Sequence, residues 1–340
     1  MKLFNLRISA KTFLHLLLVC TIFASCRPEE VDPDFPVTFG IRHDKSLAEY
    51  ETIATNQAPY NSEDYPDFAP IVMFEYSLDG SDNRDLVATG TLISPEWILT
   101  AGHNFFDSEE QTAPALLKGI NVLVGDDPNN PVATYGVAEL VFHPTWITSD
   151  GSYNLANDVC LVKLSTPITN IPPAGMATDN TEPIGGITWY CGYGDYSQQE
   201  GQDKDLFSKK HAIQNTLDRK IDGLNSGSGS STFPGGLVAF DFDSPFNNVN
   251  TLGDDIINDD EAVLGAGGSD DSALPFEGTT VSGDSGGPLF IKIDGVWKII
   301  GVLSGGASEP VADHKDSSYG DISIFMRVSS HKTWIESVVQ

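Results

Sequence analysis

The sequence is poor in basic residues and in cysteine. Its 340 residues include 19 Lys and Arg against 48 Asp and Glu, so the formal net charge is −29. A surface this acidic repels the phosphate backbone, which argues against nucleic acid as a partner. Of the four cysteines, Cys20 and Cys26 lie near the N-terminus, and the two that remain do not make a disulfide framework, even in an exported protein.

No apolar run near the N-terminus is long enough to span a bilayer comfortably. A basic start precedes the apolar stretch Phe13–Phe23, which predicts a signal peptide over residues 1–25. The small residues before Cys26 resemble a bacterial lipobox, in which the cysteine is lipidated and begins the mature chain. We expect residues 26–66 to form a lipid-linked tether and N-terminal segment. The protein would then be exported and anchored at the cell envelope or cell surface, with a cleaved, secreted form as the alternative.

From about residue 67 onward, short apolar runs alternate with turn signals, which favours an all-β architecture. Asp294-Gly295 stands between two apolar runs and predicts a tight hairpin. A helix is expected over Ser329–Gln340. The strands expected most clearly are Leu86–Ile93, Trp97–Thr100, Val132–Phe142, Val159–Leu164, Gly186–Tyr190, Pro288–Ile293 and Val296–Leu303.

Two features of the body leave alternatives open. Cys160 and Cys191 lie in apolar runs, so we expect buried free thiols, with one disulfide as the alternative. Between Ser197 and Thr280 the chain is rich in aspartate. We expect solvated loops and no metal site there, because no regular ligand spacing is present, with calcium binding as the alternative. The aspartates concerned are Asp241, Asp243, Asp254, Asp255, Asp259, Asp260, Asp270 and Asp271.

The stretch Gly283–Pro288 (GDSGGP) has the residue types of a nucleophile site. A serine hydroxyl is a weak nucleophile unless a neighbouring base takes its proton. The glycines allow a tight turn that brings the backbone N–H groups of Gly283 and Ser285 to one spot, where they would hold an oxyanion. The sequence therefore predicts acyl transfer at Ser285.

A GxSxG pattern also describes the nucleophile elbow of α/β-hydrolases. In that fold the serine leads into a helix, and the acid and histidine follow it in the chain. Here Pro288 opens a strand-like run soon after Ser285, and proline suits an early helix position poorly after such an elbow. The base is therefore expected upstream of the serine.

Two upstream residues have the setting that a base and its orienting acid need. Trp97–His103 is an apolar strand that ends in small residues and a histidine, which would deliver His103 from the rim of a packed core. Asp158 stands before the apolar run Val159–Leu164, where it can be shielded from water and bind an imidazole. Ser285, His103 and Asp158 are thus predicted as nucleophile, general base and orienting acid.

Three motifs in this order resemble those of the chymotrypsin/trypsin family of serine peptidases. TLISPEWILTAGH is similar to the strand that leads to the family's catalytic histidine, VFHPTW followed by NDVCLVKL to the approach to its aspartate, and GDSGGPL to its serine motif. The resemblance runs from about Phe68 to Gln340, within a peptidase domain expected over residues 67–340. It implies two antiparallel six-stranded β-barrels of the trypsin-like type, with the site between them and a short C-terminal helix.

The resemblance also implies substrate contacts. Ser304 falls where the family's serine supports the catalytic aspartate, and the residues after it would lie along the substrate backbone as an added strand. Because no acid stands at Thr279, the expected floor of the specificity pocket, we expect an uncharged pocket of medium size. The substrate-binding residues implied are Thr279, Thr280, Ser304, Gly305, Gly306 and Ser323.

One departure from the family pattern concerns activation. In family zymogens, cleavage exposes an amino terminus that pairs with the aspartate before the serine, here Asp284, but no Ile-Val-Gly-Gly-like sequence is found. The stretch Gly40–Asp44 resembles the leader of some bacterial members, which favours constitutive activity. We expect another cation to pair with Asp284, with Arg42 or His43 as candidates, unless an unrecognised activation site exists.

These observations predict a monomeric serine endopeptidase that hydrolyses polypeptides through an acyl-enzyme and needs no cofactor. Two alternatives remain open at this point. One is a catalytically silent binding protein on the same scaffold, and the other is an esterase with the same triad.

Overall fold

The structure is a computed structural model of the whole chain. It describes residues 38–55, 63–106, 116–146, 155–196, 208–225, 232–246, 249–253, 264–265, 267–307 and 317–339. The predicted signal peptide, Cys26 and the acidic tether lie outside the described residues, as do Asp254, Asp255, Asp259 and Asp260.

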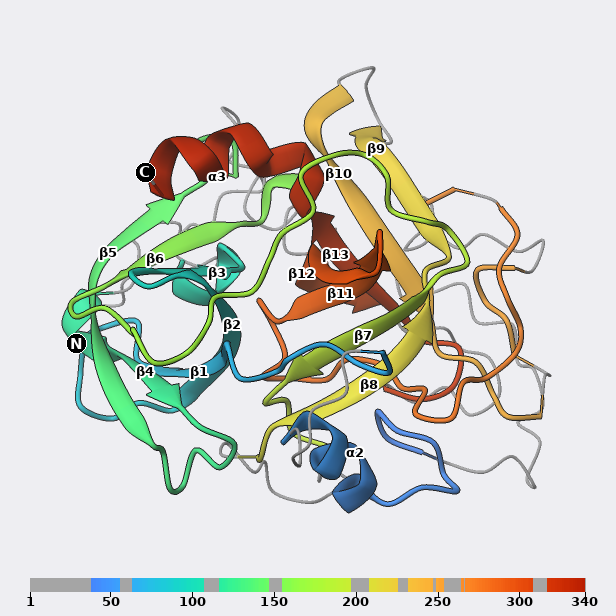
Figure 1. Cartoon of the computed structure of the whole chain (residues 1–340), viewed down its shortest axis with the longest axis horizontal. Coiled ribbons are helices and arrows are strands. Elements are labelled where there is room, and N and C mark those ends of the chain that lie inside the picture. The colour runs from blue at the N-terminus through green and yellow to red at the C-terminus, as the bar shows by residue number, and fades with distance from the viewer. Residues whose placement is uncertain are drawn as a thin grey trace, which may run out of the picture.

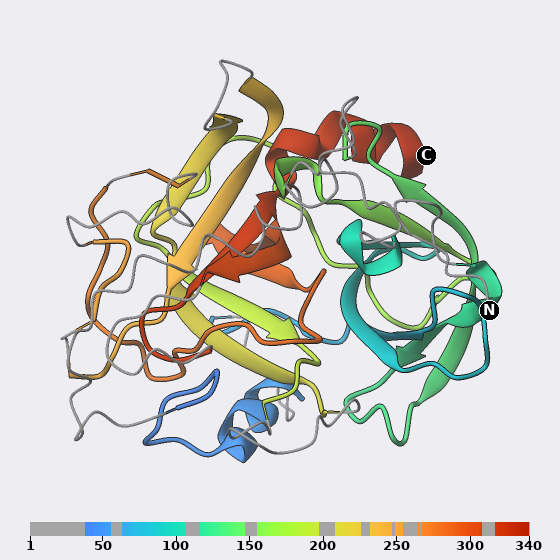
Figure 2. The same cartoon turned by 180° about the vertical axis from the view of Figure 1, so that it is seen from behind.

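Six strands form a closed antiparallel barrel in the first half of the described chain (Figures 1 and 2). Their order around the barrel is β1-β2-β3-β6-β5-β4, and pairing of β1 with β4 closes it. Its interior is filled by buried side chains such as Phe74, Ile98 and Val162. The strands are β1 (Ile71–Tyr76), β2 (Leu86–Ser94), β3 (Trp97–Thr100), β4 (Ile120–Val124), β5 (Ala133–Phe142) and β6 (Cys160–Leu164).

The second sheet has seven strands in the order β8-β7-β11-β12-β13-β10-β9. Only Leu217 and Asp218 separate β8 from β9, and there the chain changes partner: the Leu217 N–H bonds to Gly186 beside β7, and the Asp218 N–H bonds to Ala239 in β10. The bent segment β8–β9 thus joins the two edge strands of the sheet. The strands are β7 (Ile187–Gly192), β8 (His211–Thr216), β9 (Arg219–Asn225), β10 (Thr232–Asp241), β11 (Pro288–Ile293), β12 (Val296–Ala307) and β13 (Ile322–Arg327).

The predicted fold class, an all-β trypsin-like double barrel, is confirmed. The difference lies in the second sheet, which has seven strands rather than the expected six, because the chain changes partner at Leu217 and Asp218 and forms β8 and β9 as separate strands. The predicted hairpin is also confirmed, since Asp294 and Gly295 have φ angles of 52° and 78°, as a two-residue type I′ turn requires.

Two helices cover opposite ends of the molecule (Figure 1). Helix α3 (Lys332–Val339) follows the 3₁₀ turn η5 (Val328–His331) and returns to the first barrel, where the ring of Trp334 lies 4.9 Å from that of His143. Helix α2 (Leu47–Ala54) packs beside β8. Its Tyr50 is fully buried and donates to the carbonyl of Glu277 at 2.8 Å. This part of the N-terminal segment therefore belongs to the folded body.

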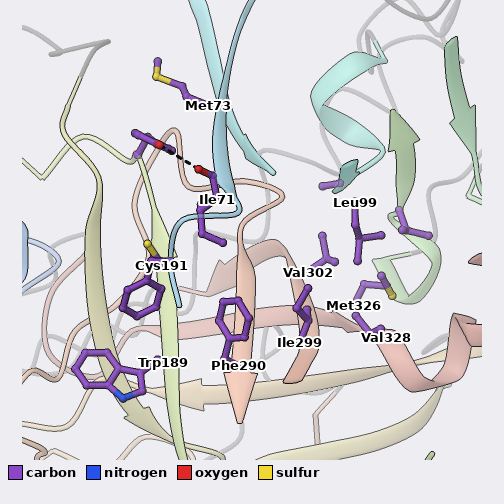
Figure 3. Packing of buried hydrophobic residues seen from close by; sticks show 14 of the residues in the cluster. Ile71, Met73, Leu99, Trp189, Cys191, Phe290, Ile299, Val302, Met326 and Val328 are labelled. Carbon is purple, nitrogen blue, oxygen red and sulfur yellow. Dashed lines mark hydrogen bonds between the residues drawn. The ribbon is translucent and has the colours of Figure 1, made fainter. Parts of the chain in front are cut away.

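An apolar cluster joins the two barrels (Figure 3). It contains Ile71 and Leu99 from the first barrel, and Phe290, Ile299 and Val302 from the second. Each of these side chains is at most 1–2 % exposed. The connecting chain adds backbone bonds to both sides, because Ala174 donates to Leu92 and Ala177 to Ile299. The relative position of the barrels is therefore set by a continuous core.

Candidate active site

His103 and Asp158 meet at one edge of the first barrel. Strands β3 and β6 pair antiparallel with Thr100 opposite Cys160, so the residues just after β3 and just before β6 share that edge. The imidazole Nδ1 of His103 lies 2.6 Å from Asp158 Oδ2, and the His103 backbone N–H donates to Oδ1 at 2.9 Å. Two contacts therefore orient the ring.

Ser304 links this pair to the second barrel. Its hydroxyl donates to Asp158 Oδ2 at 2.6 Å, and the Asp158 side chain is 0 % exposed. Ser304 lies in β12 where the register with β13 shifts between Leu303 and Gly305. A bulge of this kind re-aims a side chain, here toward the carboxylate.

The acid shifts the acid–base behaviour of the histidine. Burial of the imidazole lowers the pKa of His103, but the negative charge of Asp158 and its hydrogen bond raise it more, so the net shift is upward from 6.5. The buried carboxylate thus stabilises the imidazolium, as a general base that must carry a proton between steps requires.

Ser285 is placed beside this pair by its backbone. Its carbonyl accepts from the Thr89 N–H at 2.9 Å and from the side-chain amide of Asn104 at 3.1 Å. Asn104 is the residue directly after His103 and also contacts Thr100. The serine turn of the second barrel is therefore fastened to the segment that carries the histidine.

The turn before Ser285 has the geometry expected of an anion site. Gly283 has a φ of +97°, which favours glycine, and its carbonyl accepts from the Thr89 hydroxyl at 3.1 Å. In the described part of the chain, the backbone N–H groups of Gly283 and Ser285 have no acceptor. They are therefore free to bind an oxygen of a ligand.

The residues assigned to the specificity pocket fall into two groups. Thr279, Thr280 and Ser323 form a hydroxyl cluster, with Ser323 Oγ 3.1 Å from Thr279 Oγ1 and 3.0 Å from Thr280 Oγ1. Gly305 faces open space, and Gly306 is exposed and pairs with Ser323 across β12 and β13. An open strand edge thus lies beside an uncharged cluster.

The predicted partners of Asp284 are wrong. Arg42 forms an ion pair with Asp44 at 2.7 Å, and His43 Nδ1 lies 2.8 Å from the hydroxyl of Tyr319. Both residues follow Gly40, whose carbonyl accepts from the Thr279 N–H at 2.9 Å. The side chain that lies beside the Asp284 carboxylate is instead His211, with Nε2 3.4 Å from Oδ1.

Two of the aspartates assigned to solvated loops are buried. Asp241 is 0 % and Asp243 2 % exposed, whereas Asp270 and Asp271 are exposed as expected. The reason is that Asp241 ends β10 pointing inward, where its carboxylate accepts from the Leu252 N–H at 2.8 Å. No group of three His, Cys, Asp or Glu in the described ranges is arranged to hold a metal ion.

Two further observations concern the described residues. Cys160 and Cys191 are free and buried, which confirms the expectation of unpaired thiols. None of the helices described is both long and apolar enough to cross a membrane.

Sequence reasoning missed the residues that hold the serine turn in place. Thr89 and Asn104 bind the Ser285 carbonyl, and Tyr196 and His211 contact the Asp284 carboxylate. Only Asn104 stood next to a recognised motif. His211 opens a strand of ordinary appearance, and its role depends on a pairing 73 positions along the chain that no local pattern reveals.

Comparison with known proteins agrees with this geometry. The Trypsin family matches residues 69–223, less than half of the chain. Chymotrypsin-like elastase family member 3B of Macaca mulatta is 26% identical over 278 residues, 79% of this chain and 87% of the relative. Proproteinase E of Bos taurus is 30% identical and chymotrypsin-like elastase family member 3A of Homo sapiens 32% identical, each over 120 residues and 33% of this chain.

Those two 120-residue matches span 45% of the bovine and 42% of the human relative, less than half of each. With the double barrel, the matches support a chymotrypsin/trypsin-like serine peptidase family and a serine peptidase function in general. His103 and Asp158 lie inside the Trypsin match, whereas Ser285 lies beyond it. The serine is therefore assigned by its motif and its position.

Proposed function

We propose that the chain is a serine endopeptidase of the chymotrypsin/trypsin-like family, with Ser285 as nucleophile, His103 as general base and Asp158 as the orienting acid. The observation that carries this proposal is the row formed by Ser304, Asp158 and His103, next to a serine turn fastened by Asn104. The histidine, aspartate and serine motifs come from distant parts of the chain, and the fold brings these three segments to one region.

The proposed reaction proceeds in two halves. The hydroxyl oxygen of Ser285 attacks the peptide carbonyl carbon while His103 takes the hydroxyl proton, and the oxyanion binds the N–H groups of Gly283 and Ser285. His103 then gives the proton to the leaving amine, which breaks the C–N bond and leaves an acyl-enzyme. Water, deprotonated by His103, releases the acid and restores the serine.

The test is turnover of casein by purified protein with Ser285→Ala and Ser282→Ala as a matched pair. Ser282 is exposed and lies three positions before Ser285, so loss of its hydroxyl should leave the turn intact. We expect Ser285→Ala to lower kcat by about 10⁴-fold or more, as loss of a triad member does, and Ser282→Ala to leave it within about twofold. Equal activity of both variants would overturn the assignment.

Two other outcomes would replace the proposed function with one of the alternatives. Hydrolysis of a short-chain ester with no cleavage of casein would identify an esterase. Binding without turnover of either substrate would identify a silent scaffold. The contacts among the histidine, the acid and its supporting serine count against a silent scaffold, and the choice between peptide and ester substrates rests on the casein assay.

We propose that Thr279, Thr280, Gly306 and Ser323 line the specificity pocket and that the edge at Ser304 and Gly305 binds the substrate backbone. The support is the uncharged hydroxyl cluster next to an open strand edge. Cleavage-site profiling in a peptide library is expected to show an uncharged residue before the scissile bond. Preference for Lys or Arg there would contradict the pocket assignment.

We also propose that residues 1–25 are an export signal and that Cys26 is lipidated, which anchors residues 26–66 and the peptidase body, 67–340, at the cell envelope or surface. The support is the sequence pattern alone. Metabolic labelling with a fatty acid analogue is expected to label the wild-type chain but not Cys26→Ser. Labelling of both would show that the lipid is elsewhere.

A further inference from the structure

The peptide group that follows the proposed nucleophile is bonded to both barrels. The Ser285 carbonyl accepts from the Thr89 N–H at 2.9 Å and from the side-chain amide of Asn104 at 3.1 Å, and both donors belong to the first barrel. The N–H of the same peptide, that of Gly286, donates to the Leu303 carbonyl in β12 at 2.9 Å. The backbone of the nucleophile is therefore held across the junction of the barrels.

The edge of the first barrel leaves a place for this peptide. Pairing of β2 with β3 starts at Thr91, and two residues earlier the Thr89 N–H donates to Ser285. A Cβ added to Gly286 would collide with the hydroxyl oxygen of Thr100. The serine turn thus approaches the barrel edge as closely as a glycine permits.

The neighbours of Asn104 fix the orientation of its amide. The amide nitrogen Nδ2 also lies 3.1 Å from Thr100 Oγ1. Because the Thr100 hydroxyl gives its one proton to the Thr89 carbonyl at 2.7 Å, its oxygen can only accept from the amide. The Ser285 carbonyl can also only accept. Both amide protons of Asn104 therefore have a defined acceptor, and the reversed amide would face two acceptors with its oxygen.

Asn104 is also placed by its position in the chain. It is 4 % exposed and directly follows His103 in the 3₁₀ turn η1 (His103–Phe105). Side chains of adjacent residues in such a turn diverge by about 120°. The imidazole accordingly contacts Asp158, while the amide contacts Ser285. Two consecutive residues thus hold the acid–base pair and the backbone of the nucleophile.

The same barrel edge holds the carbonyl on the other side of Asp284. The Thr89 hydroxyl donates to the Gly283 carbonyl at 3.1 Å and accepts from the Tyr193 N–H at 3.1 Å. The carbonyls of Gly283 and Ser285 are therefore both bound by the first barrel. This arrangement restricts rotation of the turn relative to the histidine.

We propose that Asn104 is the positioning residue that aligns Ser285 with His103, because it fixes the carbonyl of the nucleophile to the residue next to the base. This inference rests on the proposed peptidase function. Asn104 contacts neither the substrate nor the reacting hydroxyl and acts through the Ser285 backbone. Alignment matters because a misplacement of about 1 Å can slow a reaction by about 10²-fold.

The test compares Asn104→Leu with Asn121→Leu in the full chain. Leucine keeps a similar volume but removes both amide donors, and Asn121, on β4 of the same barrel, donates to Glu75 away from the site. The readouts are the rate of Ser285 labelling by a fluorophosphonate, and kcat and KM for a peptide ester, per folded molecule. We expect Asn104→Leu to lower the labelling rate and kcat by about 10- to 10²-fold with KM within about threefold. Asn121→Leu should stay within about twofold of wild type.

The acidic limb of kcat/KM separates alignment of the serine from an effect on the base. The contacts between His103 and Asp158 do not involve Asn104, so the midpoint in Asn104→Leu should equal that of the wild type although kcat falls. A shifted midpoint would show that Asn104 acts through the imidazole and would overturn the inference. Labelling of Asn104→Leu at the wild-type rate, or an equal loss in the control variant, would also overturn it.

A second variant covers the case in which Asn104→Leu does not fold. Thr100→Val removes the hydroxyl that accepts the other amide proton, and it should lower the labelling rate about fivefold, as loss of one hydrogen bond does. Thr188→Val is the matched control, since Thr188 is also 0 % exposed and donates to the Asn215 carbonyl at 2.8 Å. A wild-type rate in Thr100→Val would then contradict the role of Asn104. Absence of labelling at Ser285 in the wild-type chain would instead contradict the peptidase proposal.

Discussion

At the scale of single residues, the site depends on how Asp158 is shielded. Its carboxylate is fully buried, receives the Ser304 hydroxyl and faces His103 at 2.6 Å. A neutral amide at that position would keep the shape but not the charge, and it would favour the wrong imidazole tautomer. The residue therefore contributes through its charge as well as through packing.

For Asp158→Asn we expect kcat to fall by about 10⁴-fold with little change in KM, because the lost stabilisation concerns the imidazolium formed in the transition state. Steady-state kinetics on a peptide ester would measure this. A fall of less than tenfold would mean that the acid does not orient the base.

The pH dependence follows from the shift in His103. Its pKa is raised above 6.5 because the Asp158 charge and hydrogen bond outweigh burial. His103 must be neutral to accept the serine proton, so activity is lost as the pH falls through that pKa. We expect the acidic limb of kcat/KM to have its midpoint above 6.5, and in Asp158→Asn to move to lower pH. A midpoint below 6.5 in the wild-type protein would contradict the assignment.

At the scale of elements, buried carboxyls lie at the bend between β8 and β9 and at the end of β10. Asp218, Asp241 and Asp243 are at most 5 % exposed. Burial, and then the charge of Asp241, raise the pKa of both Asp218 and Asp243. A buried carboxyl of this kind favours the folded state most when it is protonated, because burial then removes no charge from water.

The sign of the resulting pH effect is set by proton counting. The unfolded aspartate has a pKa of about 3.9, and the folded pKa of Asp218 is raised to about 8. Between these values the folded state holds more protons, so the free energy of unfolding falls as pH rises, by up to about 1.4 kcal/mol per pH unit per group. We expect Asp218→Asn to raise Tm at pH 8 but not at pH 4.

Calorimetric scans of wild type and Asp218→Asn at pH 4, 6 and 8 would measure this. Asp271→Asn, an exposed aspartate, serves as the control and should change Tm little at any pH. A Tm difference that does not grow with pH would show that the Asp218 carboxyl is ionised without cost.

The strands also show how much of the fold can be predicted from the sequence alone. Strands with compact apolar runs and clear turns were predicted within a few residues, and Pro288–Ile293 matches β11 at both ends. Strand β9 and the break at Leu217 were not predicted, because the partner change there depends on β7 and β10 rather than on local residues. The His211 contact was missed for the same reason.

At the scale of the whole molecule, the two barrels share one core. Ile299 is 0 % exposed within the cluster that also contains Leu99 and Ile71 from the first barrel (Figure 3). Removing a buried aliphatic side chain loses transfer energy and leaves a cavity. Damage on one side of this core should therefore weaken both barrels.

For Ile299→Ala we expect a loss of about 2–5 kcal/mol in the free energy of unfolding, with one cooperative transition. Val296→Ala on the same strand, at a position 57% exposed, should cost little. Denaturant unfolding followed by fluorescence would measure both. Two separate transitions in the wild-type protein would contradict a shared core.

The central claim is that Ser285 becomes the acylated residue under the control of His103. The most direct measurement is peptide mass mapping of the protein after reaction with a fluorophosphonate, for wild type and His103→Ala. We predict a single adduct on Ser285 in the wild-type chain, and none in His103→Ala within the same time. An adduct on another residue, or equal labelling of Ser285 without the histidine, would contradict the account.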